Sequence, residues 1–448
     1  MRWTSTRGSA PPATFREALF TGLAPDGGLY LPERLDAIPA ATMAALAGQS
    51  IGAVGVAIAE HLLEGEIPRA VLEKIIGAAL DFPILLVPVG RRPAGAGPHI
   101  PDAAACGPPI LGPSSGEAPC SGPTALELFH GPTFAFKDVG ARVMARFMAH
   151  FVSPGDELTV LVATSGDTGS AVAQAFAGVP GTRVVVLFPV GQVSAVQEAQ
   201  FTTIGGNITA VAVNGTFDDC QAMAKTAFAD PMLRARVRLT SANSINVGRL
   251  VPQIFYYGWA SLAAPGSVFS VPSGNFGNLT AGLIAKRLGF PIAHFIAATN
   301  VNDVVPEYLT SGRYAPRASV RTVANAMDVG APSNFERMRA IYSDDVERLR
   351  ADVRGVAFDD HAVKMAIAEV HARFAYVLDP HSAIAWLGLD ARPGVFLATA
   401  HPAKFREVVE PAIGAAVALP PALHAALARP RHVTVLAPRY EDLRDRIL

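Results

Sequence analysis

The sequence has few cysteines, no excess of one charge and no long apolar run, and each shortage excludes a class of protein. Three cysteines in 448 residues, Cys106, Cys120 and Cys220, cannot build the disulfide framework of a secreted domain. No unbroken apolar run reaches the about 18 residues of a membrane-spanning helix, and residues 1–17 lack the apolar core of a secretory signal. We therefore expect a cytoplasmic protein with no membrane partner.

The net charge and the length of the chain indicate what it binds and how many domains it has. The 37 Lys and Arg residues and 38 Asp and Glu residues give a formal net charge of -1, so no positive field favours nucleic acids. The chain is 50% hydrophobic, which supplies a large core, and its length predicts two or three domains. We expect a small-molecule substrate and no nucleic-acid partner.

Residues 91–123 interrupt the chain with a stretch rich in Pro, Gly, Ala and Ser that shows no helical or alternating apolar pattern. We interpret it as a surface loop or flexible insertion that carries no chemistry. Cys106 and Cys120 lie inside it without a second cysteine pair or a His cluster, so unpaired thiols are expected rather than a metal site. We predict no metal site anywhere in the chain.

Downstream, short apolar runs alternate with helical stretches. The runs at 158–164, 183–189 and 208–213 are each followed by a helical pattern, which is typical of βαβ units around a parallel sheet. The runs at 267–272 and 294–299 extend the pattern, so we expect a sheet of many strands.

The two ends of the chain have other patterns. Residues 14–75 are predicted to be mainly helical and to form an N-terminal domain. From about 354 to 430 we expect helices and one strand, at 395–400.

Two loops that join a strand to a helix carry glycines and polar groups, ATSGDTGSA at 163–171 and PSGNFGNLT at 272–280. Helix starts of this kind attract anions through free N–H groups and the helix dipole. Taken alone, each loop favours a purely structural turn, which is the usual role of such glycines. Neither contains a Walker sequence or GxGxxG, which disfavours an ATPase or a nicotinamide enzyme.

Lys137 follows three phenylalanines, Phe129, Phe134 and Phe136, and precedes an apolar helix. Aromatic surroundings remove water from an amine, which lowers its pKa and makes it a nucleophile or a base. For this segment alone we favour the alternative, a lysine whose stem packs on Phe136 while its ammonium reaches water. A desolvated lysine together with two anion-binding helix starts, however, indicates pyridoxal phosphate, which needs an amine for its aldehyde and N–H groups for its phosphate.

Sequence blocks along nearly the whole chain extend this argument. They are STRG (5–8), GLAPDGGLYLPE (22–33), ELFHGPTFAFKD (127–138), VATSGDTG (162–169), SANSINVGRL (241–250), SVPSGNFGNLTAGL (270–283), NAMDVGAPSNFER (325–337) and ATAHPAKF (398–405). In these blocks and in their order, the chain resembles the threonine synthases, within the tryptophan-synthase-like family of pyridoxal-phosphate enzymes. The insertion departs from the family pattern.

The resemblance implies a fold, a domain plan and a reaction. The fold is α/β, pyridoxal-phosphate fold type II, with parallel-type sheets flanked by helices plus an N-terminal mainly helical domain. The expected domains are 1–90, the insertion 91–123, a catalytic region 124–410 with two subdomains around a cofactor cleft, and a C-terminal segment 411–448. The implied reaction is that of a carbon-oxygen lyase that converts O-phospho-L-homoserine and water to L-threonine and phosphate, by a monomer or homodimer. The alternatives are a related phospho-lyase that releases 2-oxobutyrate and a non-catalytic relative.

The resemblance also assigns residues to the cofactor. Lys137 carries pyridoxal phosphate covalently and later moves protons, and Asp167 lies beside the 3-oxygen of the cofactor. Thr399 faces the pyridine nitrogen, although a threonine that merely ends a buried strand is the alternative. The turn that cradles the cofactor phosphate comprises Gly274, Asn275, Phe276, Gly277 and Asn278.

Two further groups are implied to bind the substrate. Thr164, Ser165 and Thr168 are expected to hold its carboxylate. Its phosphate is expected to contact Ser241, Asn243, Asn246 and Arg249, because arginine suits bidentate phosphate contacts. In the alternative, Asn243 and Asn246 cap a helix and Arg249 is solvated.

Overall fold

The computed structural model describes residues 1–90, 122–153 and 155–448. The chain divides into two compact units: unit 1 comprises Met1–Leu31, Lys137–Arg249 and Leu419–Leu448, and unit 2 comprises Pro32–Phe136 and Leu250–Ala418. The predicted insertion, apart from Gly122 and Pro123, and both of its cysteines, Cys106 and Cys120, lie outside the described residues. The expected domain boundaries stay predictions. No helix in the described part of the chain is long and apolar enough to cross a bilayer.

Unit 1 is built on a five-stranded parallel sheet, with the strand order β13-β7-β6-β5-β8. Its strands are β5 (Leu158–Ala163), β6 (Thr182–Pro189), β7 (Ile208–Val213), β8 (Arg238–Ser241) and β13 (Val433–Leu436). Its helices are α1 (Phe15–Thr21), α5 (Lys137–Phe151), α6 (Asp167–Phe176), α7 (Ala195–Thr202), α8 (Phe217–Ala229), α9 (Pro231–Arg236), α18 (Pro421–Leu427) and α19 (Tyr440–Ile447). The three predicted strand–helix pairs are confirmed as β5–α6, β6–α7 and β7–α8.

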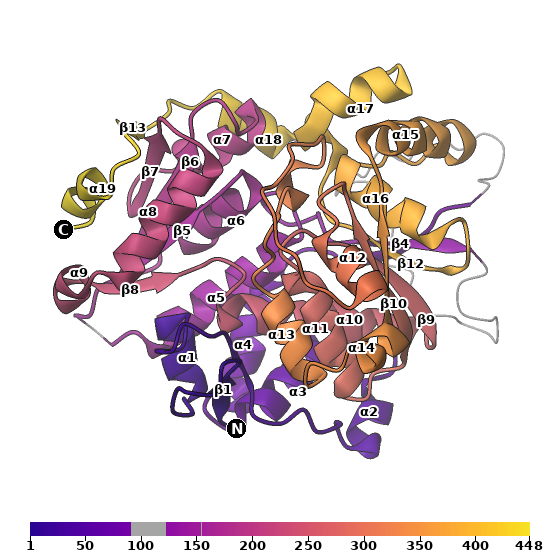
Figure 1. Ribbon diagram of the computed structural model, residues 1–448, viewed down its shortest axis with the longest axis horizontal. Coiled ribbons are helices and arrows are strands. Elements are labelled where there is room, and N and C mark those ends of the chain that lie inside the picture. Colours follow the sequence, from indigo (N-terminus) through magenta and orange to yellow (C-terminus); the bar gives the residue numbers. More distant parts are fainter. Residues whose placement is uncertain (91–121, 154) are drawn as a thin grey trace. The chain divides into compact units, whose positions relative to one another are not determined.

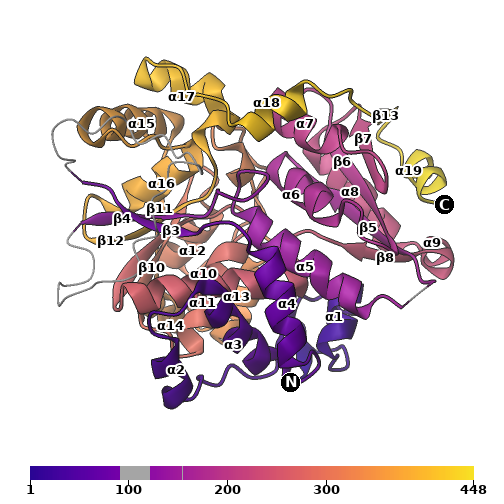
Figure 2. The same cartoon turned by 180° about the vertical axis from the view of Figure 1, so that it is seen from behind.

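Both faces of this sheet are covered. Alternate residues such as Leu161 and Val185 pack against Cys220 of α8 and Leu443 of α19, and Figure 1 shows α8 across that face. On the other face Val186 lies next to Gly169 of α6. Figure 2, which views the molecule from behind, shows α6 on this face. A strand buried on both faces has a continuous apolar sequence, which is why these runs were recognisable.

Unit 2 is built on a six-stranded sheet, with the order β11-β10-β9-β12-β4-β3, in which only the edge strand β3 is antiparallel. Its strands are β3 (Leu85–Pro88), β4 (Pro123–Glu127), β9 (Ser267–Pro272), β10 (Ile292–Thr299), β11 (Val353–Ala357) and β12 (Gly394–Ala398). Its helices are α2 (Ala40–Leu46), α3 (Ile51–Leu63), α4 (Arg69–Ala79), most of α10 (Val247–Ala263), α11 (Gly277–Arg287), α12 (Val304–Ser311), η1 (Asn325–Met327), α13 (Phe335–Ile341), α14 (Val346–Asp352), α15 (Asp360–Phe374), α16 (Pro380–Leu389), η2 (Pro402–Phe405) and α17 (Arg406–Ile413). The third sheet has two short strands, β1 (Trp3–Ser5) and β2 (Tyr30–Pro32).

Two expectations about strands were wrong. The strands form two large sheets rather than one of many strands. The region from 354 to 430 contains a second strand, because β11 pairs with β10 along Val353–Ala357. Strand β11 lies at the sheet edge and includes Arg354 and Gly355, so its sequence lacks the apolar run of a central strand.

Helix α16 approaches the sheet of unit 2 unusually closely through Gly388. A Cβ on Gly388 would lie 2.4 Å from Oγ of Ser270 in β9 and 3.3 Å from Cβ of Ala298 in β10. On the opposite face Phe295 meets Gly282 of α11. This contact holds the C-terminal end of α16 against β9 and β10 on one face of the sheet, while α11 packs on the other face.

We expect Gly388→Ala to lower the free energy of unfolding by about 1–2 kcal/mol, because the cost of overpacking exceeds the gain in helix propensity. The matched control is Gly77→Ala, in helix α4, where an added Cβ meets nothing within 4 Å and should be neutral or stabilising. Urea-induced unfolding of both variants measures the difference. Equal midpoints for the two variants would contradict this close packing.

Candidate functional site

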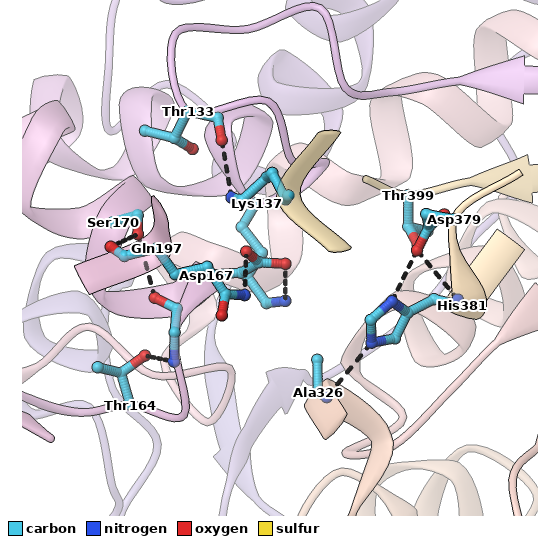
Figure 3. Close-up of polar contacts among 12 residues, drawn as sticks. Thr133, Lys137, Thr164, Asp167, Ser170, Gln197, Ala326, Asp379, His381 and Thr399 are labelled. Carbon is cyan, nitrogen blue, oxygen red and sulfur yellow. Dashed lines mark hydrogen bonds and ion pairs between the residues drawn. The ribbon is translucent and has the colours of Figure 1, made fainter. Parts of the chain in front are cut away.

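Lys137 and Asp167 lie together in unit 1. Lys137 is the first residue of α5, and its Nζ lies 3.7 Å from Oδ2 of Asp167, the first residue of α6 (Figure 3). The Lys137 side chain is 15% exposed and that of Asp167 3%. The two side chains form a largely buried ion pair. The structure therefore brings an accessible amine to the start of a helix, where anions are favoured.

The loop between β5 and α6 is shaped by Thr164. Its buried hydroxyl accepts hydrogen bonds from the N–H groups of Gly166 at 2.9 Å and Gly169 at 2.8 Å. Gly166 has a φ of 140°, a conformation that other residues rarely adopt, and a Cβ there would lie 2.6 Å from Cδ of Gln197. Ser165 and Thr168 are the partly exposed hydroxyl residues of this loop. Thr164 thus builds the turn, while Ser165 and Thr168 remain reachable.

Gln197 also belongs to this site, although no sequence motif pointed to it. Its Nε2 donates to Oδ1 of Asp167 at 2.9 Å, and the side chain is almost fully buried (Figure 3). Ser194 and Gln197 form the capping box that starts α7, and the Oγ of Ser170 donates to the Gln197 carbonyl. The capping box is visible in the sequence, but it signals only a helix start. The contact with Asp167 fixes the orientation of that carboxylate.

The four residues predicted to bind phosphate extend from Ser241, the last residue of β8, to Arg249 in the first turn of α10, and they have different roles. Asn246 is fully buried, donates through Nδ2 to the carbonyls of Leu19 and Ser241, and accepts the N–H of Gly248 through Oδ1. These three bonds make it a structural cap of α10, as the alternative expected. Asn243 donates to the carbonyl of Ala163 at 2.9 Å, which ties this loop to the end of β5.

Arg249 is not solvated, contrary to that alternative. It is 3% exposed, and its Nη1 donates to the carbonyl of Ala242 at 2.8 Å. Gly140 of α5 makes room for it, because a Cβ on Gly140 would lie 2.9 Å from Nε of Arg249. A buried guanidinium with planar donors is suited to an anionic ligand.

In unit 2 the predicted phosphate turn follows β9. A Cβ on Gly274 would lie 2.7 Å from Cα of Met327 and 2.9 Å from the carbonyl oxygen of Ala326, so only glycine fits. Phe276 has a φ of 59°, in the left-handed region, and α11 begins at the next residue. The N–H groups at the start of α11 thereby stand at the end of a tight turn, which is a geometry that binds phosphate.

Asparagine side chains hold this turn. Oδ1 of Asn275 accepts the N–H of Ser333 at 2.5 Å, so segment 325–337 backs the turn. Nδ2 of Asn278 donates to the carbonyl of Pro272 at 2.9 Å, and its Oδ1 accepts the hydroxyl of Ser273. The two amides fix the backbone of the turn on both sides.

Thr399 directly follows β12, the neighbour of β9 in the sheet. It is 4% exposed, and its carbonyl accepts the N–H of Phe136, the residue before Lys137, at 2.8 Å. Because β9 and β12 are parallel neighbours, the Gly274 turn and Thr399 both lie at the carboxyl edge of the sheet, where ligands bind in such folds.

These residues fit pyridoxal phosphate. The group needs a reachable amine and a nest of backbone N–H groups, and Lys137 and the Gly274 turn offer them. Within residues 1–90, 122–153 and 155–448, no group of three or more His, Cys, Asp or Glu side chains could hold a metal ion.

Known proteins match most of the chain in sequence. Three family models match: the pyridoxal-phosphate dependent enzymes over residues 125–397, the threonine synthase N terminus over 2–80 and the threonine synthase C-terminal region over 385–447. A threonine synthase of Serratia marcescens is 42% identical over 420 residues, covering 92% of this chain and 90% of its own.

Two solved structures are similar over nearly their full lengths. The crystal structure of the Escherichia coli threonine synthase has a TM-score of 0.88 at 37% identity, covering 100% of this chain and 99% of that one. The pyridoxal-phosphate-bound threonine synthase of Brucella melitensis has a TM-score of 0.86 at 35% identity, with coverage of 100% and 98%.

Proposed function

This chain belongs to the threonine synthase family of pyridoxal-phosphate-dependent enzymes, and from that premise we propose how its residues convert O-phospho-L-homoserine and water to L-threonine and phosphate. The enzyme is a lyase of threonine biosynthesis. The observation that carries the assignment of residues is the Lys137 amine held 3.7 Å from Asp167 at the start of α6.

The cofactor is held by groups at both of its polar ends. Lys137 would bind it covalently, Asp167 would lie beside its 3-oxygen and Thr399 would face its pyridine nitrogen. The phosphate cradle comprises Gly274, Asn275, Phe276, Gly277 and Asn278. Two observations support this cradle. The backbone of Ala326 and Met327 leaves no room for a side chain at Gly274, and the side chains of Asn275 and Asn278 hydrogen-bond to the backbone on both sides of the turn. When bound, pyridoxal phosphate supplies an electron sink at the substrate Cα.

The substrate carboxylate is bound by the loop at the start of α6, through Thr164, Ser165 and Thr168. Ser165 and Thr168 are the partly exposed members and supply direct contacts, whereas Thr164 shapes the loop. The substrate phosphate is bound at Ser241, Asn243, Asn246 and Arg249. Among these, Arg249 supplies the charge and Asn246 holds the loop.

Lys137 moves the protons of the reaction. Once the substrate amine has displaced it from the cofactor, Lys137 would take the proton from Cα of the substrate, and the Asp167 carboxylate, 3.7 Å from Nζ, would stabilise the resulting ammonium. A second proton then leaves Cβ, phosphate leaves Cγ, Cγ gains a proton, and water adds at Cβ before a proton returns to Cα. Gln197 keeps Asp167 oriented toward the amine throughout.

A product assay tests this function. We expect the holoenzyme, incubated with O-phospho-L-homoserine, to release threonine and phosphate in equal amounts. Release of phosphate with 2-oxobutyrate would assign the related phospho-lyase activity instead. Absence of phosphate release and of cofactor absorbance after reconstitution would identify a non-catalytic relative. A Lys137→Ala sample run in parallel corrects for spontaneous hydrolysis of the substrate.

We also propose, from the sequence, which partners this protein has and where in the cell it works. The substrate is a small molecule, and a net charge of -1 supports the absence of nucleic-acid and membrane partners. We keep a monomer or homodimer in the cytoplasm as the expected state, which size-exclusion chromatography with light scattering and cell fractionation would check.

A further inference from the structure

The N-terminus of α16 carries a buried polar cluster that none of the roles above uses. Asp379, its N-cap residue, is 1% exposed, and His381 and Ser382 are 4% and 1% exposed. Oδ1 of Asp379 accepts the N–H and the hydroxyl of Ser382. Oδ2 accepts the N–H of His381 at 3.0 Å and lies 2.7 Å from its Nδ1 (Figure 3). One carboxylate thus fixes both neighbouring side chains.

Each of these two side chains has a second contact, and each leads to a different part of the proposed cofactor site. Oγ of Ser382 accepts the backbone N–H of Thr399 at 3.2 Å. Nε2 of His381 lies 3.3 Å from the N–H of Ala326 (Figure 3). Ala326 and Met327 are the residues whose backbone closes over Gly274. The cluster therefore connects the strand end at Thr399 with the loop behind the phosphate turn.

The hydrogen-bond partners determine the tautomer of His381. The backbone N–H of Ala326 can only donate, so Nε2 accepts and carries no hydrogen. Nδ1 then carries the hydrogen and donates to Asp379. The ring of Phe405 packs against the imidazole with centroids 4.9 Å apart. With both nitrogens hydrogen-bonded and the ring packed beside Phe405, the imidazole is a rigid linker.

We propose that Asp379, His381 and Ser382 are positioning residues that hold Thr399 and the Gly274 turn in the geometry that the ring and the phosphate of pyridoxal phosphate require. This inference rests on the proposed function, which assigns those two contacts. A flat, rigid cofactor bound at two ends is sensitive to small displacements of either end, because residues that support a site must hold it within about half an ångström.

The test compares two substitutions of His381 that each preserve one half of its bonding. In His381→Gln the amide oxygen can still accept the N–H of Ala326. In His381→Asn the shorter amide can still donate to Asp379 but does not reach Ala326. We expect His381→Asn to raise the dissociation constant of pyridoxal phosphate, titrated into the apoprotein, by about fivefold or more, the value of one lost hydrogen bond. His381→Gln should stay closer to the parent protein.

Ser382→Ala examines the other arm of the cluster. It removes the acceptor of the Thr399 N–H, and we expect the visible absorbance of the bound cofactor to shift, because Thr399 faces the pyridine nitrogen. A merely structural role would lower the unfolding midpoint of the apoprotein without changing cofactor affinity or spectrum. If His381→Asn does not fold, the Ser382→Ala spectrum carries the test.

The outcomes separate this inference from the proposed function. If the parent protein itself binds no pyridoxal phosphate and forms no threonine, the proposed function fails. If the parent protein binds and reacts as expected, while folded His381→Asn and Ser382→Ala show unchanged affinity and spectrum, the positioning role is overturned.

Discussion

Replacement of Lys137 by alanine is expected to abolish threonine formation and the visible absorbance of covalently bound pyridoxal phosphate. The loss in turnover should be at least about a thousandfold, because general acid–base catalysis alone contributes 10²–10⁴-fold and the covalent attachment is lost as well. The structure gives this expectation a local reason. The Lys137 amine lies 3.7 Å from the buried carboxylate of Asp167, and alanine removes that positive charge.

Two further variants make the test specific. Lys137→Arg retains a cation beside Asp167 but cannot attach the cofactor covalently, so it should recover stability without recovering turnover. Lys74→Ala removes an exposed lysine of α4 and should leave both properties unchanged. Turnover and absorbance together, measured on folded protein, decide the result. Retention of both in Lys137→Ala would show that another group carries the cofactor.

The second large effect is expected from Gly274→Ala. The added methyl would lie 2.7 Å from Cα of Met327 and 2.9 Å from the carbonyl oxygen of Ala326, both backbone atoms that cannot rotate away. Either the turn or the 325–327 segment must shift. A cost of about 1–3 kcal/mol, typical of overpacking, corresponds to a roughly 5- to 150-fold weaker binding of pyridoxal phosphate.

Titration of the apoprotein with pyridoxal phosphate, followed by the product assay at saturating cofactor, measures this effect. Part of the activity should return at saturation, because Lys137 is intact. Gly77→Ala again provides the matched control, since its Cβ meets nothing within 4 Å. An unchanged dissociation constant for folded Gly274→Ala would remove this turn from the cofactor site.

The fold was predictable where strands are buried on both faces. The runs that became β5, β6 and β7 are continuous apolar segments flanked by turns, and a sequence pattern is sufficient to find them. Strands β8, β11 and β13 escaped because each lies at a sheet edge and is short and partly polar. Their structure depends on a neighbouring strand that lies far away in the sequence.

The residues of the candidate site also fall into two groups, those that a local sequence pattern reveals and those whose contacts are distant in the sequence. Glycine-bearing turns and Lys137 were visible because each stands at a strand-to-helix junction. Gln197 was not, because its contact with Asp167 spans 30 residues. His381 was not, because its contact with Ala326 spans 55. Sequence also cannot separate a hydroxyl that builds a turn, such as that of Thr164, from one that faces a ligand. The residue roles themselves stay predictions until the variants above are measured.

The position of β13 has a consequence for how the chain is made. Strand β7 ends at Val213, and its outer edge is paired only by β13, which begins at Val433, about 220 residues later. At synthesis rates of roughly 5–20 residues per second, that edge emerges from the ribosome roughly 10 to 45 seconds before its partner exists. Helix α19, which covers the apolar face beside α8, comes later still. The nascent chain therefore exposes an unpaired strand edge for about half of its translation, and a chaperone that shields such edges should raise the yield of native enzyme.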